Sequence, residues 1–337
     1  MKNEQIIFTR VNTAELLPIE WCEPQAGEVT VQTELSTISP GTERANLVGD
    51  PNVSGNAPSS VRFPRTVGYS STGTVVAIGE GVTTVAVGDR VVVYWGKHKR
   101  YNTVPEKNVI KIEDAAITPA TAALAFIATF PMAAIRKTHL ELGEPALVMG
   151  LGLLGQLAVR LLRAAGAVPI VAVDPVASRR AEALAGGADY VLDPTEEGFA
   201  DRVKSITKGG AKVAIEVTGV GAGLDGALDC MAKFGRVSLL GCTRDKEFTI
   251  DYYKKVHFPG ITLIGAHTNA RPKQESYGGY FTHEDDIRAV LALCAAGRLT
   301  LDDMVRETHR PEECGAVFNR LATDREFPIV VQFDWRK

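Results

Sequence analysis

Residues 146–174 read ALVMGLGLLGQLAVRLLRAAGAVPIVAVD, and this stretch decides the fold. The apolar run 146–149 has the length of a strand, and from Leu154 onward apolar residues recur at helical spacing. The turn GLGLLG, residues 150–155, lies between them. A second strand at 169–173 then ends at Asp174, about 20 residues after the glycines. This order predicts the opening unit of a doubly wound, nucleotide-binding sheet.

Each glycine of this turn has a physical reason. Without a Cβ, the chain can turn tightly, its backbone can approach a pyrophosphate, and the helix can pack closely on the strand. The free N–H groups of the helix N-terminus favour an anion there. The carboxylate of Asp174 can accept hydrogen bonds from an adenosine ribose. A methyltransferase that binds S-adenosylmethionine would use a similar turn, so the rest of the chain must decide between the two.

The bulk composition limits the class of protein. A chain of 337 residues usually forms two domains, and 45% hydrophobic and 23% charged residues are ordinary for a globular protein. The net charge of −3 predicts neither nucleic acid nor an anionic membrane as a partner. The N-terminus lacks the apolar core of a signal peptide, and the five cysteines are scattered, which favours reduced thiols and a cytoplasmic location.

The uncharged run 115–135 is long enough to cross a bilayer. It contains Pro119 and Pro131 and is rich in alanine, so we interpret it as a buried helix that connects two domains and expect no membrane partner.

The two sides of this run differ in pattern. Short alternating strands before residue 93 predict an antiparallel, barrel-like β domain, interrupted by an irregular segment at 39–62. After the run, strands and helices alternate, which predicts a six-stranded, doubly wound parallel sheet. The expected domains are residues 1–118, 119–282 and a return to the first domain at 283–337. The further strands are expected at 190–192, 212–217, 235–240 and 261–264, and the helices at 178–185, 199–208, 223–232 and 285–296.

This architecture resembles the medium-chain dehydrogenase/reductase superfamily, which joins a GroES-like β-barrel catalytic domain to a Rossmann domain. The resemblance covers almost the whole chain, and it argues against the methyltransferase alternative. It rests on GYSSTGTVV at 68–76, VGDRV at 87–91, the helix with Thr129, the turn 150–155 and the late pair Gly297-Arg298.

The resemblance implies a cofactor site. A pyrophosphate would lie on the glycine turn, the ribose at Asp174 with Arg179 beside it, and the nicotinamide along the later strand ends. Because Asp174 would repel a 2′-phosphate, we expect NAD rather than NADP, although Arg179 and Arg180 leave NADP open. The implied cofactor-binding residues are Gly150, Gly152, Leu153, Leu154, Gly155, Asp174, Arg179, Thr218, Gly219, Leu240, Gly241, Cys242, Ala266, His267 and Thr268.

The zinc ligands of the superfamily are missing. Zinc-dependent members have a cysteine where this chain has Pro40, and a histidine where it has Tyr69. The later cysteine and the four-cysteine lobe are also absent, and a catalytic zinc needs at least three protein ligands. We therefore expect no metal. The texture STISPGTE resembles a zinc-lacking branch of bacterial zinc-type alcohol dehydrogenase-like oxidoreductases that includes relatives of bacteriochlorophyllide dehydrogenase.

Without zinc, side chains must stabilise the negative charge that hydride transfer builds on oxygen. Thr42 stands at the position of the proton-relaying hydroxyl of the family, and Tyr69 at the position of the lost histidine; we expect both to contact the substrate oxygen. Glu43, Lys97 and His98 are secondary catalytic candidates, although residues 97–100 are also typical of a solvated loop, and Tyr69 could simply fill space.

The leading hypothesis is a zinc-independent, NAD(H)-dependent oxidoreductase that interconverts a secondary alcohol and a ketone. Polar loops at 39–60 and 268–283, with Arg44, Asn46 and Arg271, suit a sugar, polyol or cyclitol. One alternative is an NAD(P)H-dependent quinone or enone reductase, and another is a dinucleotide-binding protein without catalysis. The resemblance also implies a homodimer formed by the sixth strands.

Overall fold

The computed structural model describes residues 2–50, 62–243 and 247–336. The chain divides into two compact units: unit 1 is Met1–Ile127 with Ile287–Lys337, and unit 2 is Ala128–Asp286. The boundaries expected at 118/119 and 282/283 precede helices α2 (Pro119–Lys137) and α7 (His283–Ala295), whereas the division falls inside both helices. In α2 the physical reason is visible, because the hydroxyls of Thr37 and Ser70 in unit 1 both donate to the backbone oxygen of Ala123.

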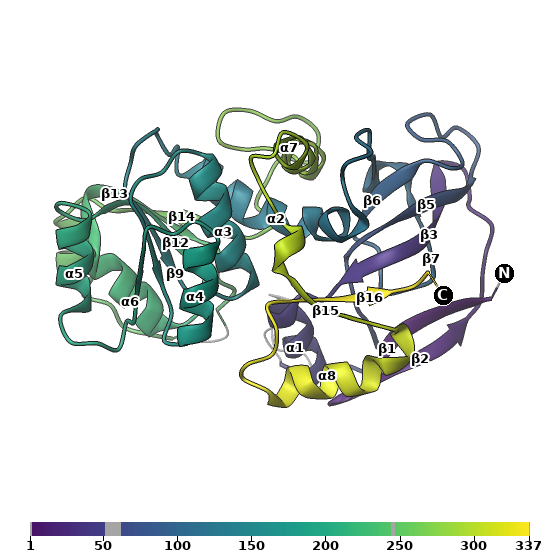
Figure 1. Ribbon diagram of the computed structural model, residues 1–337, viewed down its shortest axis with the longest axis horizontal. Coiled ribbons are helices and arrows are strands. Elements are labelled where there is room, and N and C mark those ends of the chain that lie inside the picture. The colour runs from purple at the N-terminus through teal and green to yellow at the C-terminus, as the bar shows by residue number, and fades with distance from the viewer. Residues whose placement is uncertain (1, 51–61, 244–246, 337) are drawn as a thin grey trace. The chain divides into compact units, whose positions relative to one another are not determined.

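Unit 2 is built on a six-stranded sheet in the order β11-β10-β9-β12-β13-β14, in which all neighbouring strands are parallel. Helices α3 and α4 lie on one face of this sheet, and α5 and α6 on the other (Figure 1). The expected doubly wound sheet and its helices are confirmed. The strands are β9 (Ala146–Met149), β10 (Ile170–Val173), β11 (Tyr190–Leu192), β12 (Ala211–Glu216), β13 (Met231–Leu239) and β14 (Thr262–Gly265), and the helices are α3 (Leu153–Ala164), α4 (Ala177–Ala185), α5 (Phe199–Ile206) and α6 (Gly221–Asp229).

The apolar run of β9 is buried on both faces of the sheet. Leu147 and Met149 join the core cluster that includes Val203 of α5 and Leu228 of α6, and every residue of β9 is at most 2% exposed. Strand order reverses between β9 and β12, and this is the point where parallel sheets open a crevice at the carboxyl ends of their strands. The turns that follow β9, β10, β12, β13 and β14 therefore lie at the edge where sheets of this kind bind ligands.

Unit 1 is a largely antiparallel β domain. One sheet has the order β15-β16-β3-β5-β6-β8, with β7 also paired to β3, and a smaller sheet has the order β2-β1-β4. Among the described strands of this unit, only β15 and β16 pair in parallel. Helix α8 lies along β2 and packs against α1 (Figure 1). The elements are β1 (Asn3–Arg10), β2 (Thr13–Ile19), β3 (Glu28–Thr37), α1 (Pro40–Val48), β4 (Arg65–Thr66), β5 (Ser70–Ile78), β6 (Arg90–Tyr94), β7 (Tyr101–Pro105), β8 (Val109–Lys111), β15 (Val305–His309), α8 (Cys314–Thr323) and β16 (Val330–Asp334).

The expectation of an irregular segment at 39–62 was wrong for its first part, because α1 forms there. Pro40 occupies the first helical turn, and the Glu43 carboxylate accepts the backbone N–H of Ser39. Gly49 ends the helix with a left-handed φ of 74°. These signals are local, but the helix has little apolar periodicity to reveal it. Residues 51–61 lie outside the described part of the chain.

Helix α2 has the length and apolar composition of a membrane span, and 83% of its most apolar window is buried inside the protein. The interpretation of this run as a buried helix is therefore confirmed.

Candidate functional site

The glycine turn after β9 shows three separate uses of glycine. Gly150 has a left-handed φ of 98°, which an L side chain rarely adopts. A Cβ on Gly155 would lie 1.9 Å from the backbone oxygen of Gly150, so helix α3 packs against the turn as only glycine allows. A Cβ on Gly152 would meet no atom within 4 Å. Space is therefore open beside Gly152, at the N-terminus of α3, where the first N–H groups of a helix have no acceptor within the helix.

The carboxylate of Asp174 links the end of β10 to this turn. It is 4% exposed, and its two oxygens accept the backbone N–H groups of Leu151 and Val176, both at 2.8 Å. The guanidinium of Arg179 lies 3.7 Å from one of these oxygens. A carboxylate has about four lone-pair positions, so Asp174 keeps acceptor capacity for a ribose hydroxyl while it holds the turn.

A second carboxylate, which the sequence analysis did not single out, organises the ends of β12 and β13. Glu216 is 4% exposed, and one of its oxygens accepts both the backbone N–H and the hydroxyl of Thr218. Its backbone oxygen accepts the N–H groups of Leu240 and Gly241, and a Cβ on Gly241 would lie 2.5 Å from the backbone nitrogen of Gly219. Burial raises the pKa of Glu216. An acidic residue at the end of an apolar strand was the available signal.

The remaining cofactor candidates follow β13 and β14. The backbone oxygen of Cys242 would be 2.8 Å from a Cβ on Gly219, so these two turns are in close contact. Ala266 is buried, His267 is exposed, and the buried hydroxyl of Thr268 has no hydrogen-bond partner in the described ranges. Within unit 2, the predicted cofactor residues thus gather at the carboxyl ends of the parallel strands.

In unit 1 the structure brings Tyr69 to the N-terminus of α1. The Tyr69 hydroxyl donates to Oγ of Ser39 and is also within hydrogen-bonding reach of Thr42. The Tyr69 ring packs against Trp95 and Phe126, with centroids 5.8 and 5.9 Å away. Burial raises the pKa of Tyr69, and the charge of Glu43 raises it further. Tyr69 is therefore a hydrogen-bond donor at neutral pH and not a base.

Ser39 is a residue that the sequence analysis missed. It is the N-cap of α1, yet its hydroxyl makes no capping hydrogen bond. Its backbone N–H donates to Glu43 at 2.9 Å, and its hydroxyl oxygen accepts the hydrogen bond of Tyr69. The signal was a serine directly before a proline that can begin a helix.

Behind Glu43 lies a fully buried chain of polar groups. Glu43 is 2% exposed and is 2.9 Å from Nε2 of His98, which is 0% exposed. Nδ1 of His98 is 2.8 Å from the hydroxyl of Ser36, and Ser36 also accepts the indole N–H of Trp335 at 2.9 Å. The indole can only donate, so every group is satisfied when Ser36 donates to Nδ1 and Nε2 donates to Glu43.

The interpretation of residues 97–100 as a solvated loop was therefore wrong for His98, whose ring is enclosed by Phe318 and Phe333. Lys97 is half-buried, and its ammonium forms no hydrogen bond or ion pair with any residue that the structure describes. Burial lowers the pKa of Lys97, and the charge of Glu43 opposes this shift.

Trp95 is a second residue that the sequence analysis missed. It has a left-handed φ of 59°, its side chain is 39% exposed, and its backbone N–H donates to the oxygen of Tyr69. Such a φ is strained for a bulky residue, and strain of this kind gathers at functional sites. No sequence pattern indicated it.

These side chains do not suit zinc. His98 and Glu43, which are the metal-type ligands of the group, are buried and bonded to each other, and their neighbours are an ammonium and a protonated phenol. Across 2–50, 62–243 and 247–336, no three His, Cys, Asp or Glu side chains cluster in a way that could hold a metal ion.

Two protein families match this chain, one in each part of the sequence. The alcohol dehydrogenase GroES-like domain family matches residues 25–114, and the zinc-binding dehydrogenase family matches residues 154–281. The L-threonine 3-dehydrogenase of Thermococcus kodakarensis is 30% identical over 88% of this chain and 87% of its own. The D-guloside 3-dehydrogenase of Escherichia coli K12 is 26% identical over 81% and 83%.

Solved structures share the fold. An Escherichia coli oxidoreductase/dehydrogenase of unknown specificity has a TM-score of 0.85 at 19% identity and covers 99% of both chains. An alcohol dehydrogenase of Escherichia coli CFT073 complexed with NADH has a TM-score of 0.83 at 18% identity, and a protein from Sinorhizobium meliloti 1021 bound to NADP has 0.81 at 20%; both also cover 99% of each chain.

The fold, both family matches and the extent of the threonine dehydrogenase similarity agree. This chain belongs to the medium-chain dehydrogenase/reductase superfamily. It is an oxidoreductase of the alcohol dehydrogenase type.

Proposed function

We propose that this protein is an NAD(H)-dependent oxidoreductase that interconverts a secondary alcohol and a ketone without zinc. The observation that carries this proposal is the Tyr69 hydroxyl, which is kept protonated by burial and held by Ser39 at the N-terminus of α1. By resemblance, this position belongs to a zinc-binding histidine in metal-dependent members of the superfamily. A protonated phenol can supply there the stabilisation that an oxyanion requires.

The side chains of unit 1 then have distinct roles. In the reductive direction negative charge builds on the carbonyl oxygen, and the Thr42 hydroxyl donates a hydrogen bond to it. When substrate binds, the single hydrogen of the Tyr69 hydroxyl would turn from Ser39 to the same oxygen, and Ser39 would then donate its own hydroxyl hydrogen to the phenol oxygen. The half-buried ammonium of Lys97 supplies positive charge nearby. Glu43 acts as a positioning residue because it accepts the N–H of Ser39, and His98 because it holds Glu43; both are buried and closed to substrate.

The residues of unit 2 fit a nicotinamide dinucleotide. The open space at Gly152 would take the pyrophosphate, Asp174 the ribose, and residues 266–268 the carboxamide. When bound, this cofactor supplies or accepts the hydride. The buried carboxylate of Asp174 favours NAD, because it would repel a 2′-phosphate. Arg179, 3.7 Å from that carboxylate, is the residue that would permit NADP.

The substrate class that we propose is a sugar, polyol or cyclitol. Two observations support it: a relative acts on a guloside, and the partly exposed ring of Trp95 stands beside Tyr69, where it could face the apolar side of a sugar ring. The polar loops give less support than expected. Arg44 donates to the oxygen of Ala322, and Asn46 accepts from Arg65, so both are engaged within the protein.

A cytoplasmic homodimer is also proposed. Strand β14 ends the sheet of unit 2, and Leu263 on this strand is 38% exposed. An unpaired edge of this kind can pair with a second copy of the chain.

The proposal is tested by nicotinamide absorbance of chelator-treated protein incubated with NAD and a panel of sugars, cyclitols and simple secondary alcohols. NAD reduction by a polyhydroxylated compound, unaffected by added zinc, is the expected result. Turnover with quinones or enones and NADPH alone would favour the reductase. Binding of NAD without turnover of any compound would favour a non-catalytic role.

A further inference from the structure

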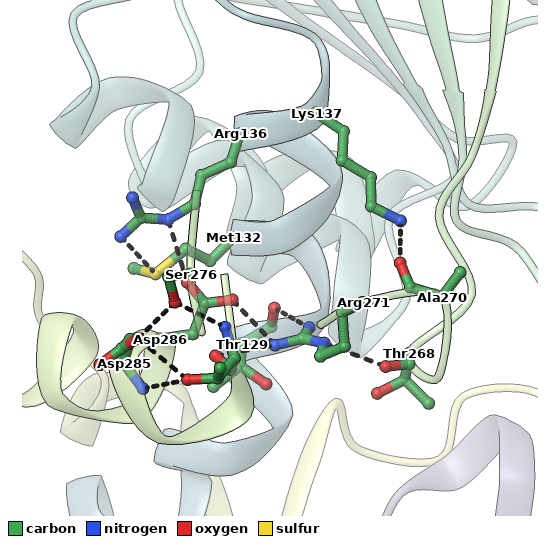
Figure 2. Close-up of polar contacts among 11 residues, drawn as sticks. Thr129, Met132, Arg136, Lys137, Thr268, Ala270, Arg271, Ser276, Asp285 and Asp286 are labelled. Atoms are coloured by element: carbon green, nitrogen blue, oxygen red, sulfur yellow. Dashed lines mark hydrogen bonds and ion pairs between the residues drawn. The ribbon is translucent and has the colours of Figure 1, made fainter. Parts of the chain in front are cut away.

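A single ammonium holds both ends of the loop that follows β14. Nζ of Lys137, the last residue of α2, donates to the backbone oxygens of Gly265 at 3.0 Å and Ala270 at 2.5 Å. Lys137 is 4% exposed. Within the loop, the N–H of Ala270 donates to the oxygen of His267. The ammonium thus bridges the two ends of the segment 265–270, and Figure 2 shows its contact with Ala270.

Arg271, the next residue, provides a second anchor. Its side chain is 3% exposed, and it donates to the backbone oxygens of Thr268 at 3.0 Å and Thr129 at 3.1 Å. It also pairs with the fully buried carboxylate of Asp286 at 2.9 Å, and Arg136 pairs with the other oxygen of that carboxylate at 3.0 Å (Figure 2). The expectation that Arg271 is a substrate-facing loop residue was therefore wrong, because its partners come from α2 and α7.

Positively charged side chains gather next to this loop, and burying them costs free energy. Arg136 and Arg271 share the fully buried carboxylate of Asp286, whereas the ammonium of Lys137 contacts backbone oxygens. Burial lowers the pKa of both Lys137 and Arg271. A turn that served only to connect two elements would not require a desolvated ammonium and a desolvated guanidinium. Their hydrogen bonds go to loop backbone oxygens, which fixes the course of the backbone and leaves the side chain of His267 exposed.

We propose that Lys137 is a positioning residue that holds loop 266–270 ready for the nicotinamide end of the cofactor, with Arg271 as its second anchor. The inference rests on the proposed NAD(H) site, in which residues 266–268 reach the carboxamide. A loop fixed before binding loses less conformational entropy when the ligand arrives. Lys137 therefore contributes to affinity for the nicotinamide half of the cofactor and not for the adenosine half, which the glycine turn and Asp174 bind.

The test compares two ligands on the full-length protein. NADH contains both halves, whereas ADP-ribose lacks the nicotinamide. Lys137→Met removes the ammonium but keeps the apolar stem, and we expect it to weaken NADH binding about tenfold while ADP-ribose binding stays unchanged. Fluorescence titration and calorimetry measure the two dissociation constants.

Lys255→Met is the matched control, because the ammonium of Lys255 also makes two polar contacts in unit 2, here with the carboxylates of Asp225 and Asp229 of α6. It should change neither affinity. If Lys137→Met does not fold, Lys137→Gln, which keeps two N–H donors without the charge, takes its place. Equal losses for both ligands, or an unchanged NADH affinity, would overturn the inference. If the wild-type protein binds neither NADH nor ADP-ribose, the result would instead contradict the proposed NAD(H)-dependent function.

Discussion

The hydroxyl of Tyr69 donates its hydrogen to Oγ of Ser39, the N-cap residue of α1. The two residues lie 30 positions apart in the chain, and the carboxylate of Glu43 accepts the backbone N–H of the same serine. The pair couples a helix N-terminus to a protonated phenol. Substitution of Tyr69 is therefore the most direct test of the proposed chemistry.

Replacing Tyr69 with phenylalanine should lower kcat about 100-fold, because it removes one hydrogen bond to a developing oxyanion. The proper control is Tyr94→Phe, since Tyr94 also packs on Phe126 and donates to a backbone oxygen, that of Lys107. Steady-state kinetics of the two variants should separate them. Equal activities would remove Tyr69 from the mechanism.

The glycine turn offers a second matched pair. Gly155→Ala should destabilise the protein by about 3 kcal/mol, because its Cβ would collide with the oxygen of Gly150. Gly152→Ala should fold normally and lose NADH affinity, because its Cβ would enter the open space beside α3. Denaturant unfolding and NADH titration measure the two effects. Retention of full NADH affinity by Gly152→Ala would contradict the proposed pyrophosphate position.

Removal of the Glu43 carboxylate should lower the free energy of unfolding. Glu43→Ala leaves the N–H groups of His98 and Ser39 buried without their acceptor, and we expect a loss of about 3 kcal/mol in the free energy of unfolding. Glu4→Ala breaks a partly exposed ion pair with Arg100 and should cost less, about 1 kcal/mol. Urea denaturation of both variants provides the comparison, and similar losses would argue against the buried chain.

His283 should make stability depend on pH. Burial lowers its pKa to about 3 from 6.5, and the charge of Arg271 adds to the shift. The unfolded chain therefore binds the proton first as pH falls, so this contribution to stability is present above pH 6.5 and is lost toward pH 3.

His283→Gln should remove that component, which amounts to at most about 2 kcal/mol between about pH 7 and about pH 5. Denaturant unfolding at several pH values measures it. His267→Gln, at an exposed ring, serves as the control. A wild-type slope that survives in His283→Gln would show that other groups cause it.

The doubly wound sheet and most of its cofactor candidates could be predicted because their signals are local. The turn 150–155 and Asp174 lie within one strand–helix–strand unit, where glycine spacing and apolar period act over a few residues. Parallel topology then brings Thr218, Gly241 and Thr268 to the same edge of the sheet, because each follows a strand of that sheet.

The polar groups behind the proposed chemistry could not be predicted in the same way. His98 meets Glu43 across 55 positions, and Trp335 meets Ser36 across 299, so no spacing in the sequence indicates either contact. From the sequence, Arg271 was interpreted as a polar loop residue, because its partner Asp286 lies on α7, a separate element. Local periodicity and turn chemistry determine which elements form, whereas the satisfaction of buried charges depends on which distant elements pack together, and only the tertiary structure decides that.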